Sequence, residues 1–301
     1  MAIPLEHSQD QKPEALLSQP AAWSAATIRS LLVGTLLLAV FWPILYGIYR
    51  SWFDPGIYME HGLLVVPTAV YMVWTQRDKL KSIALRPSGW GLVLLIGGAL
   101  EAALGLLAHW IWFTRTAFLI SLVGSIALVF GFSMVRALSY PLATLVLMIA
   151  PPTFVFASAT LHLQLLASRL GAAGLDWLGY SVLRDGNVLE MVGIKLSVAE
   201  ACSGIRSLLA IIFICVLYNY FFVNGRSMKT VILLMSVPIA ILGNAGRIVA
   251  TGIAGQYDSS LVEGATHEAF GYVSVALAAA GCIGLHWVLQ HLQKMRRSKH
   301  A

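Results

Sequence analysis

Residues 203–223 read SGIRSLLAIIFICVLYNYFFV, the most informative stretch of the chain for its fold. Arg206 is its one charged residue, and a helix of about 20 apolar residues is long enough to cross about 30 Å of hydrocarbon. Seven similar apolar segments lie at about 30–49, 61–76, 89–108, 116–133, 136–152, 229–250 and 270–291. We therefore expect an all-α integral membrane protein, a bundle of about eight transmembrane helices.

The composition excludes most soluble classes. Lys, Arg, Asp and Glu make up 11% of the 301 residues and apolar residues 58%, whereas ordinary soluble domains carry roughly 25% charged residues. Rossmann, TIM-barrel and all-β globular folds are thereby excluded. The net charge of +6 does not indicate nucleic-acid binding, because the basic residues lie between and beyond the apolar segments, as membrane topology requires.

The positions of Lys and Arg predict the orientation of the chain. The connections at 76–88 and 224–229 and the tail at 293–301 are basic, and basic connections stay in the cytoplasm. Eight spans put all three on that side, together with a flexible tail at 1–28, so both termini are expected to be cytoplasmic. Residues 29–292 would form one transmembrane domain.

The opposite side then holds the longest connection, about 153–202, and the loop at 251–269. Residues 160–180 could lie as a helix at the membrane interface. Residues 187–199 read NVLEMVGIKLSVA, a partly alternating pattern that predicts a short hairpin before the sixth span. We expect the functional residues on this side.

Cys202 is the first candidate for chemistry, within Glu200-Ala201-Cys202-Ser203-Gly204-Ile205-Arg206. It precedes the sixth span, so its sulfur would lie near the positive end of a helix dipole. Arg206 follows one turn later, and both features favour a reactive thiolate. The alternative is a small packed residue at a helix start. Cys215 and Cys282 lie inside apolar segments, where cysteine usually acts as a small hydrophobic residue.

The second candidate is Arg247, in Gly243-Asn244-Ala245-Gly246-Arg247 near the outer end of the seventh span. An arginine in an apolar segment is costly and usually functional. Asn244 precedes it by three residues and shares its helix face. Arg247 could bind a carbonyl or an oxyanion. Alternatively, it could serve structurally by snorkelling to the membrane boundary or by neutralising Asp258 or Glu263.

The third candidate is His267, in GATHEAFGY at 264–272, which the predicted topology also puts on the outer side. There it could exchange protons near neutral pH. Glu101, the one acid deep in a span, could orient His267 or pair with Arg247. His61 and His162 are weaker candidates, and His286 falls near the cytoplasmic end. Each signal is weak alone, but the topology predicts that Cys202, Arg247 and His267 reach one membrane boundary.

Several motifs are missing from the sequence. Gly271 stands where a zinc protease of the HExxH type needs its second His, and there is no Gly-x-Ser-x-Gly and no P-loop. We therefore expect neither a metal nor a cofactor, and favour thiol chemistry. A transporter or assembly subunit for polysaccharide or lipid intermediates is the alternative function, and a non-catalytic scaffold is another.

Three blocks together, AEACSGIRSLL (199–209), GNAGRI (243–248) and THEAFGYV (266–273), resemble the exosortase/archaeosortase family, specifically bacterial exosortases. The resemblance covers about 30–290, and its specificity comes almost wholly from 185–273. It identifies Cys202 as the nucleophile, with Arg247 and His267 as its catalytic partners. Asn244, Arg206, Glu200 and Glu101 are supporting candidates. Thr266 departs from the aromatic residue expected before the histidine.

The resemblance implies a cysteine protease and transpeptidase of the bacterial inner membrane. Its substrates would be membrane-anchored proteins with a C-terminal PEP-CTERM sorting signal, cleaved at the periplasmic boundary. An exopolysaccharide or another molecule would accept the cleaved chain. The lipid bilayer is the other expected partner, and nucleic acid is not one.

Overall fold

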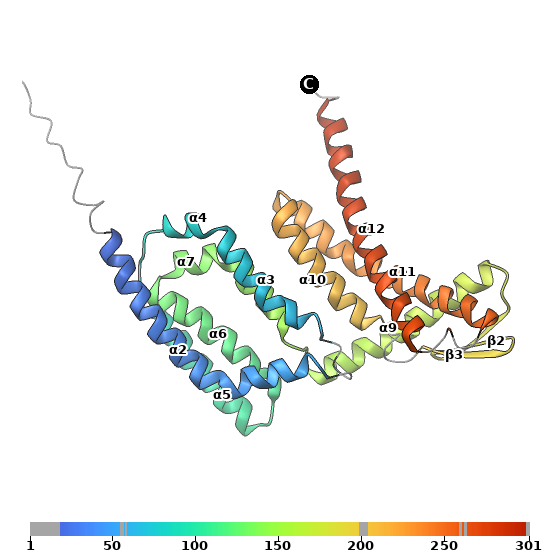
Figure 1. Cartoon of the computed structure of the whole chain (residues 1–301), viewed down its shortest axis with the longest axis horizontal. Coiled ribbons are helices and arrows are strands. Elements are labelled where there is room, and N and C mark those ends of the chain that lie inside the picture. The colour runs from blue at the N-terminus through green and yellow to red at the C-terminus, as the bar shows by residue number, and fades with distance from the viewer. Residues whose placement is uncertain are drawn as a thin grey trace, which may run out of the picture. The chain divides into compact units, whose positions relative to one another are not determined.

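The computed structural model describes residues 19–54, 57, 59–198, 204–258, 261 and 264–298, with the side chains of 19–26, 264, 265, 267 and 296–298 left out. The described chain is helical apart from one small sheet (Figure 1). Its elements are α2 (Gln19–Ser51), α3 (Gly62–Thr75), α4 (Arg77–Lys81), α5 (Trp90–Leu107), α6 (Ile111–Val129), α7 (Phe132–Ala137), α8 (Ser139–Leu145), η1 (Val146–Met148), α9 (Thr153–Trp177), β1 (Val182–Asp185), β2 (Val188–Met191), β3 (Ile194–Ser197), α10 (Ile205–Phe222), α11 (Arg226–Tyr257) and α12 (Gly264–Ser298).

The predicted all-α membrane class is confirmed by the length and composition of the helices. Among the described residues, six helices are long and apolar enough to cross a membrane, and one bent helix pair would make a seventh. The second predicted span corresponds to α3, which has 14 residues and is shorter than a standard span. Helix α2 begins at Gln19, within the predicted tail, and α12 continues to Ser298.

The fifth predicted span, 136–152, is not a single helix. Residues 139–148 form α8 and η1, and they meet α9 at an angle of 78°. Pro151 and Pro152 explain the break, because proline lacks an N–H donor and disfavours helical conformation in the residue before it. The segment after the break is the long helix α9, which covers residues 160–177 of the helix predicted at 160–180.

The chain forms two compact units, residues 1–46 with 73–142 and residues 47–72 with 143–301. In the first unit, α5 and α6 pack closely through glycines. A methyl group added at Gly91 would lie 2.6 Å from the carbonyl oxygen of Gly124, and one at Gly105 would lie 2.8 Å from the Thr114 methyl carbon. Small residues at helix interfaces allow this backbone approach in membranes.

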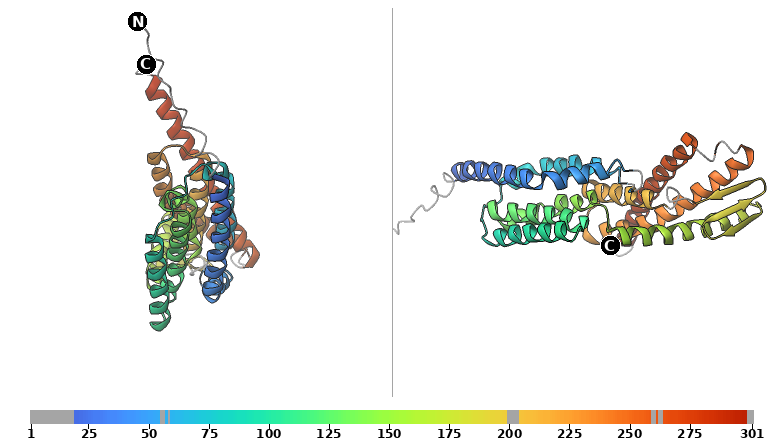
Figure 2. Two further views of the ribbon diagram at one scale, coloured as in Figure 1. Left: turned by 90° about the vertical axis from the view of Figure 1, so that its left-hand side faces the viewer. Right: turned by 90° about the horizontal axis from the view of Figure 1, so that it is seen from below.

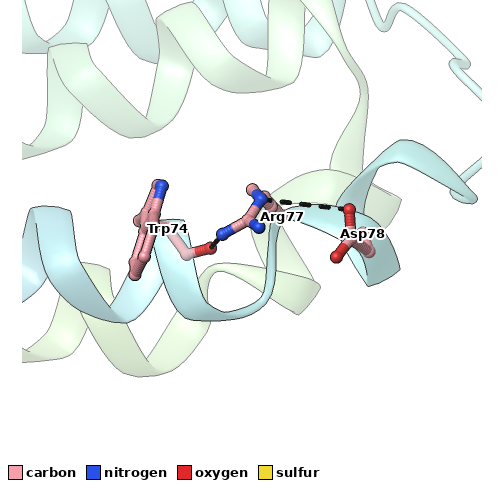
Figure 3. Close-up of polar contacts among 3 residues, drawn as sticks. All are labelled: Trp74, Arg77 and Asp78. Atoms are coloured by element: carbon pink, nitrogen blue, oxygen red, sulfur yellow. Dashed lines mark hydrogen bonds and ion pairs between the residues drawn. The ribbon is translucent and has the colours of Figure 1, made fainter.

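The residues of a basic turn between α3 and α4 belong to the first unit (Figure 3). The guanidinium carbon of Arg77 lies 4.6 Å from the centre of the Trp74 ring. Its Nη1 donates to the Trp74 carbonyl at 3.4 Å, and its Nε lies 4.0 Å from Asp78. Tryptophan and arginine together at a helix end are typical of a membrane–water interface.

In the second unit, α10, α11 and α12 pack against one another (Figure 1). Their shared core includes Ile211, Cys215, Ile232 and Cys282. His286 of α12 is buried, where its Nδ1 contacts the Tyr218 hydroxyl at 2.7 Å and its Nε2 contacts the Gln290 amide at 2.8 Å. The Nδ1 contact therefore joins α12 to α10, and the Nε2 contact lies within α12.

The sheet packs beside the ends of α9 and α11 (Figures 1 and 2). It is antiparallel with strand order β1-β2-β3. The predicted hairpin is confirmed as β2–β3, and β1 extends it by one strand that the sequence did not predict. Buried side chains from the sheet, α9 and α11 form a core of their own: Ala167, Leu175, Leu189, Met191, Leu196, Val198 and Ile248.

Candidate active site

The segment that carries the predicted nucleophile is anchored at both of its ends. Cys202 and Glu200 lie outside the described residues. Before them, the Val198 N–H donates to the Asn187 carbonyl at 2.8 Å, and the Asn187 amide returns a bond to the Val198 carbonyl at 3.2 Å. After them, Gly204 is the N-cap residue of α10, and its carbonyl accepts a hydrogen bond from the Leu208 N–H at 2.8 Å.

Asn244 of α11 lies directly against Gly204. Gly204 has φ of 84°, a conformation that glycine adopts without steric cost. A methyl group added there would lie 2.8 Å from Nδ2 of Asn244. The Asn244 side chain is only 2% exposed. The second sequence block thus touches the first immediately beyond the cysteine.

Arg247 of α11 lies close to the third block, as Asn244 does to the first. It is 7% exposed, and a methyl group added at Gly271 of α12 would lie 3.4 Å from its Nη1. Gly243 brings the two helices together nearby, because a methyl group there would lie 3.4 Å from both the Ala278 Cβ and the Ser274 carbonyl. A guanidinium buried at this helix interface is costly unless it has a specific role.

His267 lies in α12, four residues before Gly271, so one helical turn separates them. Its side chain is outside the described residues. The described contacts therefore connect all three predicted blocks through α11, because Asn244 lies against the first block and Arg247 lies against the third. The relative positions of the Cys202 sulfur, the Arg247 guanidinium and the His267 ring stay a prediction.

Arg206 lies in the first turn of α10 and has a partner that the sequence did not indicate. Its Nη2 is 3.1 Å from the Glu60 carboxylate, and both side chains are partly exposed. Glu60 comes from the connection between α2 and α3, far away in sequence. Because Glu60 compensates the charge of Arg206, less positive potential remains to stabilise a thiolate at Cys202.

His61, next to Glu60, packs against Phe213 of α10 with ring centres 6.0 Å apart. Burial lowers the pKa of His61, while a backbone hydrogen bond at Leu147 and the charge of Glu60 oppose that shift. The imidazole is therefore neutral near pH 7 and serves mainly in packing. A spacing rule could not have found this contact, since the two segments are about 150 residues apart in sequence.

Glu101 belongs to the other unit, where its carboxylate accepts a 2.6 Å hydrogen bond from the Thr116 hydroxyl. Its suggested roles toward His267 or Arg247 stay predictions. Cys215 and Cys282 are free and buried in the apolar core of α10–α12, as predicted for small packed residues. Within the described parts of the chain, no group of three His, Cys, Asp or Glu could hold a metal ion.

Comparison with known proteins adds one finding. A family model described as transmembrane exosortase matches residues 52–284. The match spans all three blocks, the sheet and helices α3 to α11, and it ends within α12. No curated protein and no solved structure matches the chain.

Proposed function

Because the chain belongs to the transmembrane exosortase family, we propose that it is a membrane-embedded cysteine protease and transpeptidase with Cys202, Arg247 and His267 as its catalytic residues. The substrates are membrane-anchored proteins with C-terminal PEP-CTERM sorting signals. The enzyme resides in the bacterial inner membrane with both termini in the cytoplasm, and cleaves at the periplasmic boundary. Its products belong to exopolysaccharide-associated protein sorting.

The observation that carries this proposal is the double contact made by α11. Asn244 lies against Gly204, two residues after Cys202, and Arg247 lies against Gly271, one turn after His267. Two peptide units join Cys202 to Gly204, so their Cα atoms are at most about 7.6 Å apart. This short tether supports a common site for the three residues, because α11 lies beside both flanking segments.

The chemistry assigned to each residue follows from its type. The Cys202 thiolate attacks the scissile carbonyl carbon, which forms a C–S bond and leaves negative charge on the carbonyl oxygen. Arg247 stabilises that oxyanion from its buried position, where low dielectric strengthens the interaction. As the C–N bond breaks, His267 gives a proton to the leaving amine. Water or another nucleophile then releases the acyl chain from the thioester.

Arg247 suits the electrostatic role better than Arg206 does. Arg206 is partly exposed and its charge is compensated by Glu60, whereas Arg247 is buried between α11 and α12 beside the third block. Burial adds strength to a charge that acts on a developing anion. We assign Arg206 to holding the start of α10, and Asn244 to holding the glycine that follows the nucleophile.

Three cysteine variants test the proposal in cells that express a tagged sorting-signal substrate. Cys202→Ser should abolish processing, because the hydroxyl is a far weaker nucleophile than a thiolate without a strong base. Cys215→Ala and Cys282→Ala should process normally, since both thiols lie in the apolar core. Mass spectrometry of the new substrate C-terminus would identify the cut site and the acceptor. Equal activity in Cys202→Ser and the parent protein would exclude the mechanism.

A further inference from the structure

Strand β3 is an edge strand that leads directly into the cysteine segment. The sheet has the order β1-β2-β3, and within the described part of the chain no strand pairs with the second side of β3. An unpaired strand edge offers a row of backbone donors and acceptors to another extended chain. Only Val198 and three further residues separate the end of β3 from Cys202.

The register shows which residues of β3 present their backbone groups at this free edge. The Val198 N–H donates to the Asn187 carbonyl, toward β2. Because inward and outward residues alternate along a strand, Leu196 and Ile194 also direct their backbone groups to β2. Lys195 and Ser197 therefore direct their N–H and C=O groups away from the sheet.

One face of the sheet packs against α9 and α11, and this packing holds the free edge of β3 in place. Leu196 and Val198 are buried against the core that includes Ile248 of α11. Gln256 at the end of α11 donates a 2.8 Å hydrogen bond to the Val192 carbonyl in the β2–β3 turn. The Lys195 side chain is 74% exposed and forms an ion pair with Glu190. The backbone edge is thus fixed by the fold, with small or exposed side chains beside it.

From this geometry we propose that β3 binds an extended segment of the substrate protein as a fourth strand, next to the bond that is cut. This inference rests on the proposed function and adds the mode of substrate binding. The five peptide units from Ser197 to Cys202 span at most about 18 Å, so a peptide paired with Lys195 and Ser197 has its scissile bond within a few residues of the thiol. Main-chain pairing supplies affinity independent of most side chains.

Charge at the edge is consistent with a peptide as the occupant. Lys195 is paired with Glu190 on the neighbouring strand, so the edge carries no net charge from this pair and does not select strongly for an anion or a cation. What it offers is a pair of amide donors and a pair of carbonyl acceptors two residues apart. An extended polypeptide is the partner that matches this period.

Proline substitution tests the edge without breaking the β2–β3 ladder. Ser197→Pro removes an outward N–H and blocks strand approach, and edge strands tolerate proline at such positions. Ser197→Ala removes only the hydroxyl. Arg184→Pro is the control for a proline at the opposite edge, on β1, because Arg184 directs its N–H away from β2 by the same alternation, and Arg184→Ala accounts for the lost hydrogen bond from the Arg184 guanidinium to the Gly186 carbonyl. In the full-length protein, Ser197→Pro should lower kcat/KM about ten-fold through KM, with Ser197→Ala and Arg184→Pro near the parent.

The rate of Cys202 alkylation by iodoacetamide should be the same in Ser197→Pro and the parent protein. Parent-like processing by Ser197→Pro, or equal losses in Ser197→Pro and Arg184→Pro, would overturn strand pairing while leaving the proposed function intact. Failure of the proposed function would appear differently, as processing by Cys202→Ser.

A second test changes the substrate and leaves the enzyme unaltered, so it does not depend on how a variant folds. Synthetic sorting-signal peptides are N-methylated at one backbone amide at a time and assayed with the parent protein. Strand pairing predicts that methylation weakens cleavage at alternate amides and is tolerated at the amides between them, because only every second amide faces β3. Losses without this two-residue period would refute the pairing.

Discussion

Glycines bring helices together in both units of this protein, but what fills the space differs. Gly91 and Gly105 of α5 face the backbone and a methyl group of α6. Gly204 and Gly271 of the second unit instead face the amide of Asn244 and the guanidinium of Arg247. At these four positions the same residue type permits backbone packing between α5 and α6, and leaves room for a buried polar side chain beside Gly204 and Gly271. Whether a glycine indicates a functional site therefore depends on the atoms that it faces.

The sharpest way to break this comparison is Gly204→Ala. The new methyl group would meet the Asn244 amide at 2.8 Å, in a backbone conformation with φ of 84°. Left-handed conformation costs a non-glycine residue about 1–2 kcal/mol, and displacement of Asn244 moves the segment beside Cys202. We expect kcat/KM for a sorting-signal substrate to fall at least about ten-fold, with the protein still inserted in the membrane.

Gly179→Ala is the control for backbone strain alone. Gly179 has φ of 89°, and a methyl group added there would meet open space. It should lower thermal stability slightly and leave processing unchanged. If both alanine variants lost the same activity, the contact between Gly204 and Asn244 would have no special role.

The sequence predicts three blocks of a candidate site but not the way they meet. Ordered motifs and topology put Cys202, Arg247 and His267 at one boundary, and the contacts of Asn244 and Arg247 support that prediction. Which glycine faces which side chain depends on helix rotation, and an apolar pattern fixes rotation only loosely. The partnership of Arg206 with Glu60 was not predictable from either local segment.

The boundaries of the elements depend largely on local sequence features, which predict some elements better than others. Residues 89–108 were predicted as a span and α5 covers Trp90–Leu107, because unbroken hydrophobicity is a local property. The prediction at 136–152 gave too little weight to Pro151 and Pro152, whose effect on a helix is also local. The sequence does not predict strand β1, because VLRD at 182–185 is too short and too polar for alternation to reveal it.

Gly91→Ala tests the first unit, where it should weaken the packing of α5 against α6. Its methyl group would meet the Leu128 backbone nitrogen and lie 2.6 Å from the Gly124 carbonyl, neither of which can move without separating the helices. Overpacking costs about 1–3 kcal/mol, so the melting temperature in detergent should fall by several degrees. Activity per folded molecule should stay unchanged.

The matched control is Gly97→Ala on the same helix, where a methyl group would meet nothing within 4 Å. This variant should melt like the parent protein. A drop in melting temperature as large as that of Gly91→Ala would show that the helix pair does not depend on close approach at Gly91.

Gly271→Ala should have a smaller effect than Gly204→Ala. Its methyl group would lie 3.4 Å from Nη1 of Arg247, an ordinary contact, and no positive φ adds strain. We expect processing within about two-fold of the parent protein. Gly284→Ala, in open space on the same helix, is the comparison for helix propensity. A ten-fold loss in Gly271→Ala alone would mean that the guanidinium needs more room during the reaction than it has at rest.

The smallest effect is expected at His61, a polar side chain of the second unit that serves in packing. Burial lowers its pKa, so the unfolded chain binds the proton more readily than the folded one. Its stabilising contribution is therefore complete above about pH 6.5, the ordinary value, and is lost as the pH falls below it.

His61→Gln should reduce the fall in melting temperature between pH 7 and pH 5 by a few degrees and leave processing at pH 7 unchanged. The exposed His162, which contacts the Ser158 carbonyl, gives the control His162→Gln for a histidine change in the same unit, and this variant should melt and process substrate like the parent protein at pH 7. A large loss of processing in His61→Gln would instead move His61 from packing into the chemistry of the site, and polar burial in this unit would then indicate function at more positions than Asn244 and Arg247.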